Sequence, residues 1–162
     1  MAIHRMDNDT WLFGSNCFVC EPRNDAGLHI PFDHDDEEHL VFATFTLDQR
    51  FSGAPNFIHG GVTLAILDEA QAWATIALAG KFAVTVETTT TFARPVFVGA
   101  TYRVEGRVSD TTETHIATTG VVLNEKGKPC AESRASFAIL SEAQAATALG
   151  TDVTEDARGF LR

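Results

Sequence analysis

The chain has 162 residues, 44% of them hydrophobic, and a formal net charge of −10. This length suits one globular domain with a real core. So acidic a chain lacks the basic face that general nucleic-acid binding needs, and we expect no nucleic-acid partner. Residues 1–7 lack the apolar core of a signal peptide, so we expect a cytoplasmic protein with no membrane partner.

Two cysteines near the N-terminus, Cys17 and Cys20, have the CxxC spacing of metal ligands and redox pairs. A structural zinc site needs four ligands, which usually include a second cysteine pair. The third cysteine, Cys130, lies far along the sequence, and the histidines are scattered. We therefore predict reduced, partly buried thiols and no metal site.

Two strands are predicted in the first third of the chain. Residues 28–32 alternate after a turn at 24–27, whereas the acidic run 34–38 is typical of a solvated loop. Residues 40–47 alternate again. The apolar face of this second strand consists of Val41, Ala43, Phe45 and Leu47.

Residues 60–79 form the central pattern of the sequence, because nearly all of them are apolar or small. A helix that is apolar all round must be buried. Asp68 and Glu69 interrupt the pattern, which makes it too short in apolar sequence to cross a membrane. Burying an ionised carboxylate is costly unless it is paired or near water, so Asp68 is a candidate functional group.

Four more strands follow, separated by turns at 109–112 and 124–127, and residues 142–149 read as a short helix. The four strands are predicted at 84–92, 101–108, 115–123 and 131–139. The order predicts an α+β fold, with a curved antiparallel sheet wrapped around one long central helix. One sheet covers only part of such a helix, so we expect a second copy of the chain to cover the rest.

Gly60 and Gly61 begin the helix, where backbone N–H groups are left without partners. Glycines place no Cβ in the way of a ligand, and the helix dipole adds partial positive charge. This arrangement suits an oxyanion or a polarised carbonyl oxygen. A tight turn against a neighbouring strand explains the two glycines equally well.

Asp68 and Gly61 project from nearly the same face of the helix but lie ~10.5 Å apart along its axis. One carbonyl carbon needs its nucleophile and its oxyanion donors within roughly 3–3.5 Å. A single helix therefore cannot bring both groups to one carbonyl. If both act, an antiparallel second copy must place its Gly60 beside the first copy's Asp68, at sites shared within a homodimer.

The run Gly-Ala-Pro-Asn-Phe-Ile-His-Gly-Gly at 53–61, with Asp68 nine residues after His59, resembles the hotdog-fold acyl-CoA thioesterases. Within that superfamily it is most similar to the phenylacetate-pathway branch. Thr85 and the Arg94-Pro95 pair fall where that branch has a Ser or Thr and the end of a strand.

The opening around the two N-terminal cysteines is also similar to the lead-in of some bacterial members. The resemblance covers roughly residues 17–140, which we take as the hotdog thioesterase domain. Residues 1–16 are then an N-terminal lead-in, and 141–162 a C-terminal tail with a poorly anchored end.

The resemblance implies hydrolysis of an acyl- or aryl-CoA thioester, with coenzyme A as part of the substrate and no separate cofactor. Asp68 would be the nucleophile or general base, and the Gly60 N–H of the partner subunit would polarise the carbonyl. His59 would shape the turn, and Thr85 would help to place the attacking water. In similar proteins such dimers often pair into tetramers.

Other hotdog branches use a Glu on this helix, but sharing a face with Gly61 favours Asp68 over Glu69. Some members carry a polarising Asn six residues before the His, where this chain has Gly53; Asn56 is the nearest amide. The residues that the resemblance assigns to substrate binding are Asn56, Thr91, Ala93 and Arg94, with Lys126, Lys128 and Arg134 as further candidates or plain surface charges.

Two other functions stay open. A hotdog hydratase or dehydratase would use His59 and a carboxylate as an acid–base pair. A non-catalytic domain would bind acyl-CoA as a sensor. Thiol release from an acyl-CoA separates the thioesterase from the sensor, and water addition to an enoyl-CoA identifies the hydratase.

Overall fold

A computed structural model describes residues 2–7 and 15–150 of the chain. The strands in this part are β1 (Ile3–Met6), β2 (Phe32–Asp35), β3 (Leu40–Thr46), β4 (Ala83–Phe92), β5 (Thr101–Thr111), β6 (His115–Leu123) and β7 (Pro129–Ile139). The helices are α1 (Gly60–Ala77) and α2 (Glu142–Leu149), with a 3-10 turn at Gln49–Phe51.

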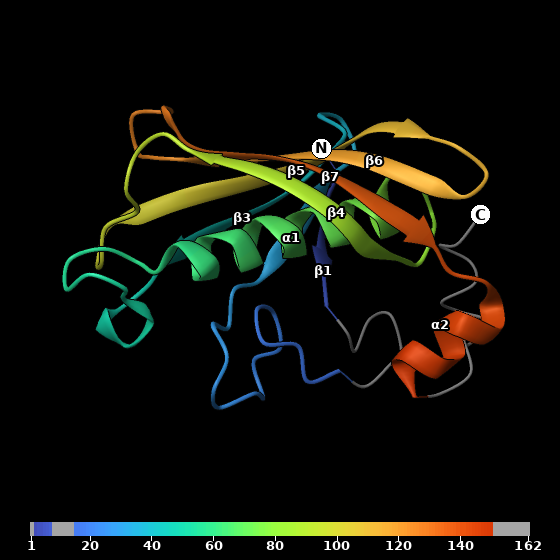
Figure 1. Ribbon diagram of the computed structural model, residues 1–162, viewed down its shortest axis with the longest axis horizontal. Helices are drawn as coiled ribbons and strands as arrows, with labels where there is room; N and C mark the ends of the chain where they lie inside the picture. The colour runs from blue at the N-terminus through green and yellow to red at the C-terminus, as the bar shows by residue number, and fades with distance from the viewer. Residues whose placement is uncertain (1, 8–14, 151–162) are drawn as a thin grey trace.

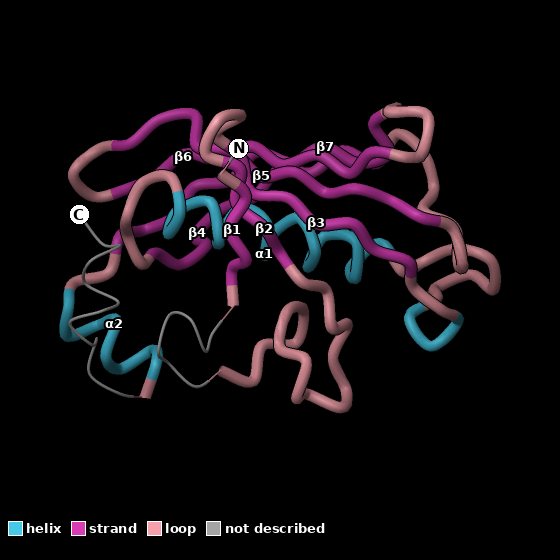
Figure 2. The backbone as a smooth tube through the Cα atoms, turned by 180° about the vertical axis from the view of Figure 1, so that it is seen from behind, coloured by secondary structure: helices cyan, strands magenta, loops and turns pink. Residues whose placement is uncertain are grey.

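The strands form one antiparallel sheet in the order β1-β2-β3-β5-β6-β7-β4, and α1 lies along one of its faces (Figures 1 and 2). This is the predicted α+β arrangement of a sheet on a long central helix, so the expected hotdog fold is confirmed. None of the helices in the described part of the chain has the length and apolarity needed to cross a bilayer.

The helix packs very closely on the middle of the sheet. Gly106 and Gly120 face each other across β5 and β6, directly beneath α1. A Cβ at Gly106 would lie only 2.4 Å from the Ala70 carbonyl oxygen, so a larger residue there would push the helix off the sheet. The buried helix residues of this contact include Ile66, Leu67, Ala70, Trp73 and Ala74.

Gln71 is a buried polar residue on the same helix, and its partners are all structural. Its Nε2 donates to the Leu67 carbonyl and to Ser133 Oγ, each at 3.1 Å, while its Oε1 accepts from Thr118 Oγ1 at 2.8 Å. A fully satisfied buried network of this kind fixes how the helix sits on the sheet. The polar interruptions of α1 therefore need not all be functional.

The strands before the helix differ from the prediction. Residues 28–31 form no strand, and β2 begins only at Phe32, so part of the expected acidic loop pairs with β3. Pro31 has no N–H to donate to a ladder, which favours pairing after it. The strand β1 was not predicted at all; it pairs with β2 at the sheet edge.

The elements that follow the central helix agree better with the prediction. β6 and α2 have the predicted bounds, and the turn at 124–127 is present. The predicted turn at 109–112 is wrong, because a bulge between Val108 and Asp110 lets β5 continue to Thr111. The proposed lead-in at 1–16 and the tail at 141–162 lie partly outside the described residues, and the expected loose end of the tail lies wholly outside them.

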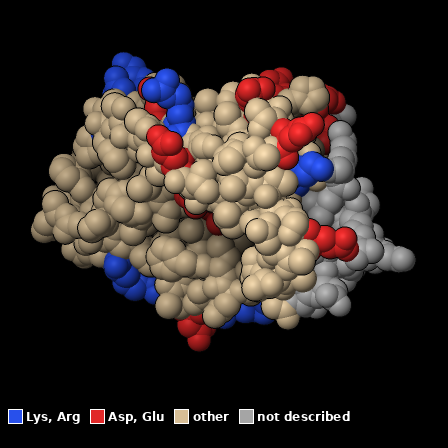
Figure 3. All heavy atoms as spheres, turned by 45° about the vertical axis from the view of Figure 1, so that its right-hand side comes forward, with Lys and Arg blue, Asp and Glu red and all other residues tan. Residues whose placement is uncertain are grey.

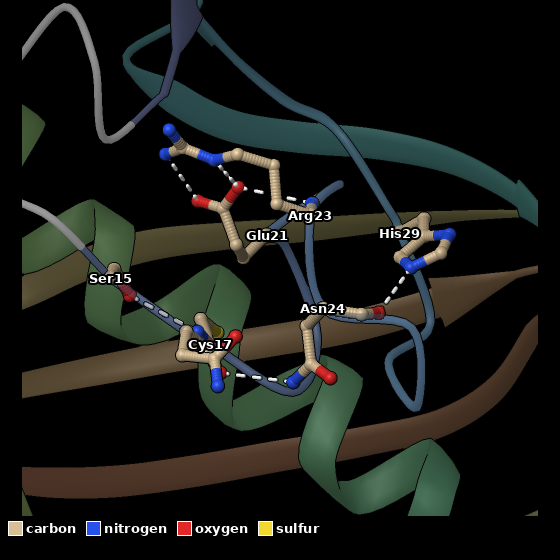
Figure 4. A network of polar contacts seen from close by, with 7 residues as sticks. Ser15, Cys17, Glu21, Arg23, Asn24 and His29 are labelled. Atoms are coloured by element: carbon tan, nitrogen blue, oxygen red, sulfur yellow. Dashed lines mark hydrogen bonds and ion pairs between the residues drawn. The ribbon is translucent and has the colours of Figure 1, made fainter.

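Residues 15–31 lie on the side of α1 that faces away from the sheet (Figures 1 and 2). They have no regular structure but bury Val19, Leu28 and Ile30 in the core. Inside this segment the buried Glu21 pairs with Arg23 at 2.6 Å, and Asn24 Nδ2 donates to the Asn16 carbonyl (Figure 4). We call residues 15–31 the N-terminal segment.

Candidate active site

His59 caps the N-terminus of α1. Its Nδ1 accepts a hydrogen bond from the Gly61 N–H at 2.9 Å, and its carbonyl accepts from the amides of Val62 and Thr63. The expectation of two free amides is therefore wrong for Gly61, because a cap satisfies one of the first orphan donors of a helix. A neutral His59 ring that accepts at Nδ1 carries its proton on Nε2.

The two glycines of the turn have different explanations. A Cβ at Gly61 would lie 3.1 Å from His59 Nδ1, so the cap itself demands a small residue there. At Gly60 the nearest side-chain atom is Phe92 Cε1 at 3.9 Å, and the backbone does not have a positive φ. Nothing in the described residues therefore requires a glycine at position 60.

The amide of Gly60 is the free donor of the turn. No acceptor for its N–H lies in the part of the chain that the structure describes. Gly60 is exposed, and it is the first residue of α1, where the helix dipole favours negative charge. A group from outside the chain can approach this amide closely.

Asp68 lies half-buried in α1 and is held by the edge strand β4. Thr85 Oγ1 donates to Asp68 Oδ1 at 2.6 Å, next to an irregularity of β4 between Thr85 and Glu87. The structure thus brings together two of the predicted site residues. It does not bring Gly60 to them, since eight residues of regular helix separate Gly60 from Asp68 by about 12 Å.

The strand β4 lies at the edge of the sheet and in front of it in Figure 1. It pairs only with β7 among the described residues. Three of its large apolar side chains are exposed, Val84 by 44%, Val86 by 55% and Phe92 by 51%. In the view of Figure 3 the middle of the molecular surface carries few charged side chains. A long apolar edge of this kind is a pairing surface.

Of the other predicted binding residues, all but Thr91 lie on two loops that meet near the start of α1. The Asn56 carbonyl accepts from the Val98 N–H at 2.9 Å, which ties the loop before the helix to the segment after β4. Thr91 is exposed near the end of β4. The amides of Ala93 and Arg94 both donate to the Cys130 carbonyl, and Arg94 Nη1 donates to the Pro129 carbonyl at 2.6 Å.

The further cationic candidates are less well placed. Lys126 and Lys128 lie at the β6–β7 turn, where their amides donate to Asn124 Oδ1. Arg134 is exposed on β7 between the buried Ser133 and Ala135, so it lies on the face of the sheet that points away from α1. These positions favour the interpretation that the three residues are plain surface charges.

Glu69, next to Asp68, turns into a different environment. Its Oε1 accepts from Cys17 Sγ at 3.2 Å, and burial raises the pKa of its carboxyl to about 8. Successive helix residues are turned by about 100°, so Asp68 contacts β4 while Glu69 contacts the N-terminal segment. The sequence did not predict this partner of Glu69; the CxxC spacing was its only signal.

Residues 55–131 match the family described as Thioesterase superfamily. No curated protein matches the chain. Among solved structures, a thioesterase superfamily protein aligns with a TM-score of 0.72 and 24% identity, covering 80% of this chain and 64% of its own length. This chain thus spans less than two thirds of that protein.

Two further solved structures share the fold. The PaaI protein of the E. coli phenylacetic acid degradation operon aligns with a TM-score of 0.62 and 23% identity, over 70% of this chain and 81% of its own. A Streptococcus mutans protein bound to acetyl-CoA aligns with a TM-score of 0.60 and 19% identity, over 64% and 82% of the two chains. The match at residues 55–131 is to the superfamily that the resemblance predicted, and these solved structures share its fold.

Proposed function

We propose that the chain hydrolyses an acyl- or aryl-CoA thioester to the free acid and coenzyme A, at sites shared between the two subunits of a homodimer. The observation that carries the proposal is the pair formed by Asp68 and Thr85. A carboxylate in a largely apolar helix is held by one hydroxyl at 2.6 Å, and no cation is paired with it in the described residues.

The pair leaves Asp68 equipped for the reaction. Thr85 occupies Oδ1, whereas Oδ2 has no partner among the described residues and can take a proton from water or attack the thioester carbon. As a general base, Asp68 passes that proton to the coenzyme A thiolate when the carbon–sulfur bond breaks. As a nucleophile, it attacks the thioester carbon and displaces the coenzyme A thiolate; water then hydrolyses the resulting mixed anhydride to the free acid and restores Asp68.

The Gly60 N–H supplies the second requirement, a donor for the oxygen that becomes negative. Because it lies about 12 Å from Asp68 along α1, it serves the site of the other subunit. The unpaired edge of β4 and its exposed apolar side chains support a twofold pairing along this strand. Association of two such dimers into a tetramer is a further proposal that rests on the resemblance alone.

Recognition of coenzyme A rests on the end of α1 where Asn56, His59 and Arg94 lie on neighbouring loops. Arg94 is the exposed cation of this group and suits a phosphate of the cofactor arm. Solved structural neighbours from Streptococcus mutans and Streptococcus pneumoniae hold acetyl-CoA and coenzyme A, which supports a ligand of the same class here.

The test is thiol release across a panel of aliphatic and aromatic acyl-CoAs, with wild type, Asp68→Asn and Glu69→Gln. We expect Asp68→Asn to lose on the order of 100-fold or more in rate with fold and dimer intact. The matched neighbour Glu69→Gln should cost much less, because Glu69 points away from Thr85.

An Asp68→Asn variant that keeps more than about a tenth of the rate removes Asp68 from this role. A wild type that binds acyl-CoA without releasing thiol is a binding domain instead. Water addition to an enoyl-CoA would favour the hydratase. The cap on Gly61 already occupies His59 Nδ1, so only Nε2 of that ring is available for acid–base chemistry.

A further inference from the structure

A second cluster of reactive side chains lies on the other side of α1 from Thr85. It consists of Cys17 and Cys20 from the N-terminal segment and Glu69 from the helix. One ligand atom of each, the two sulfurs and a carboxylate oxygen, lie within 4.8 Å of one another. The cluster plays no part in the proposed hydrolysis, so any ligand that it binds is independent of that function.

The spacing suits a single metal ion. A zinc ion binds thiolate sulfur at about 2.3 Å and carboxylate oxygen at about 2.0–2.2 Å, so tetrahedral ligands lie roughly 3.5–4 Å apart. The three ligand atoms need only small rotamer changes to reach that separation. They come from a turn and from a regular helix, so the backbones that carry them are already in place.

The turn is built to hold a thiolate. The amides of Val19 and Cys20 both donate to Cys17 Sγ, at 3.3 and 3.4 Å. Ser15 Oγ accepts from the Cys17 N–H at 3.1 Å (Figure 4). Hydrogen bonds to sulfur favour the thiolate, which is the form that binds metals.

The cluster also lacks a counter-charge of its own. No Lys, Arg or His in the described residues pairs with Glu69. Two ionisable thiols and a half-buried carboxyl therefore share one site, and without a counter-charge they cannot all lose their protons at neutral pH. A divalent cation would replace those protons and allow all three groups to ionise.

We propose that Cys17, Cys20 and Glu69 bind one transition-metal ion of the zinc class, with a fourth position open to water. Two thiolates select against Mg²⁺ and Ca²⁺, which prefer oxygen ligands only. The ion would fasten the N-terminal segment to α1, beside the helix turn that carries Asp68. The expectation of no metal rested on a missing second cysteine pair, and the helix carboxylate supplies the missing third ligand.

The test is a cobalt titration of the full chain, reduced with a phosphine and freed of metal by a chelator. Thiolate ligation of Co²⁺ gives a charge-transfer absorption that oxygen ligands alone do not give. We expect saturation at one Co²⁺ per chain and displacement of the cobalt by Zn²⁺. Cys17→Ser and Cys20→Ser should lose the band, and Glu69→Gln should weaken binding on the order of 10- to 100-fold.

Cys130→Ala is the matched control, because Cys130 is buried at the start of β7 and far from the cluster in sequence; it should keep the band. If a serine variant fails to fold, the titrations of wild type and Glu69→Gln still decide the proposal. Loss of the band in Cys130→Ala, no saturable binding by wild type, or binding that survives Cys17→Ser overturns the proposal. So does a non-binding wild type whose mass falls by two hydrogens in air, which would identify a Cys17–Cys20 disulfide pair instead.

Discussion

Gly60→Pro tests the shared site most directly, because proline removes the amide donor and little else. Proline is tolerated at the first position of a helix, where Gly60 lies. The residue before proline must be extended, and His59 already has φ −57° and ψ 132°. A Cβ at position 60 would meet nothing closer than Phe92 Cε1 at 3.9 Å. The variant should therefore fold and keep the His59 cap.

The expected loss comes from the hydrogen bond that disappears. Removing one oxyanion donor costs about 10²- to 10³-fold in kcat, or about 2.7–4 kcal/mol of transition-state stabilisation. Gly60→Ala is the matched control, since alanine keeps the N–H and its Cβ has the same room. We expect Gly60→Ala to stay within a few-fold of wild type and Gly60→Pro to be nearly inactive in a thiol-release assay.

Mixing Gly60→Pro with Asp68→Asn then asks which chain supplies each group. In a mixed dimer one site carries both defects and the other carries neither. With free subunit exchange about half of the dimers are mixed, so an equimolar mixture should recover about a quarter of the wild-type activity. Mass spectrometry of intact dimers first verifies that exchange has occurred.

Three results would contradict the shared site. If Gly60→Ala loses as much activity as Gly60→Pro, the glycine serves close packing against a partner or ligand and not its amide. If mixed dimers form from folded variants and stay inactive, Gly60 and Asp68 do not meet across the dimer. An active wild type that is strictly monomeric refutes the shared site outright.

Three further predictions concern neighbouring residues. Thr85→Val should lower kcat about 10-fold or more while Thr85→Ser retains it, since only the hydroxyl contacts Asp68; equal rates for both would exclude this contact from catalysis. Val86→Lys, on the exposed edge of β4, should yield inactive monomers in size-exclusion chromatography, and an active dimer would move the interface elsewhere. With a chelator present, the melting temperature of Glu69→Gln should rise relative to that of wild type as the pH goes from 5 to 9. The pKa of Glu69 is raised to about 8 in the folded state, so wild type loses stability as the pH rises above the unfolded pKa of this carboxyl. A gain that does not change with pH would contradict a buried, protonated Glu69.

The parts of the fold that the sequence predicted are those with long, strong periodicity. The apolar pattern at 60–79 and the alternation at 115–123 leave few choices, and both elements lie close to their predicted bounds. β1 has only four residues, three of them exposed, so it carries no periodic signal. β2 is stabilised by pairing on both sides, which its acidic composition does not reveal.

The candidate site, too, could be predicted from the sequence only in part. The resemblance named Asp68 and Thr85, and the structure brings these two side chains into contact. The hydrogen bond from the Gly61 N–H to His59 Nδ1 depends on the rotamer of the His59 side chain, which the spacing of residues in the sequence does not predict. The contact of Cys17 with Glu69 joins residues 52 positions apart, so only the folded chain shows that the cysteines have a third partner.

Two adjacent carboxylates in one buried helix would repel each other and destabilise the fold if both faced the same low-dielectric interior. Here the helix turn separates them, so that Asp68 gains a hydroxyl donor on β4 and Glu69 gains thiols from the N-terminal segment. Asp68 still contributes to the raised pKa of Glu69, which means that the two sites remain electrostatically connected.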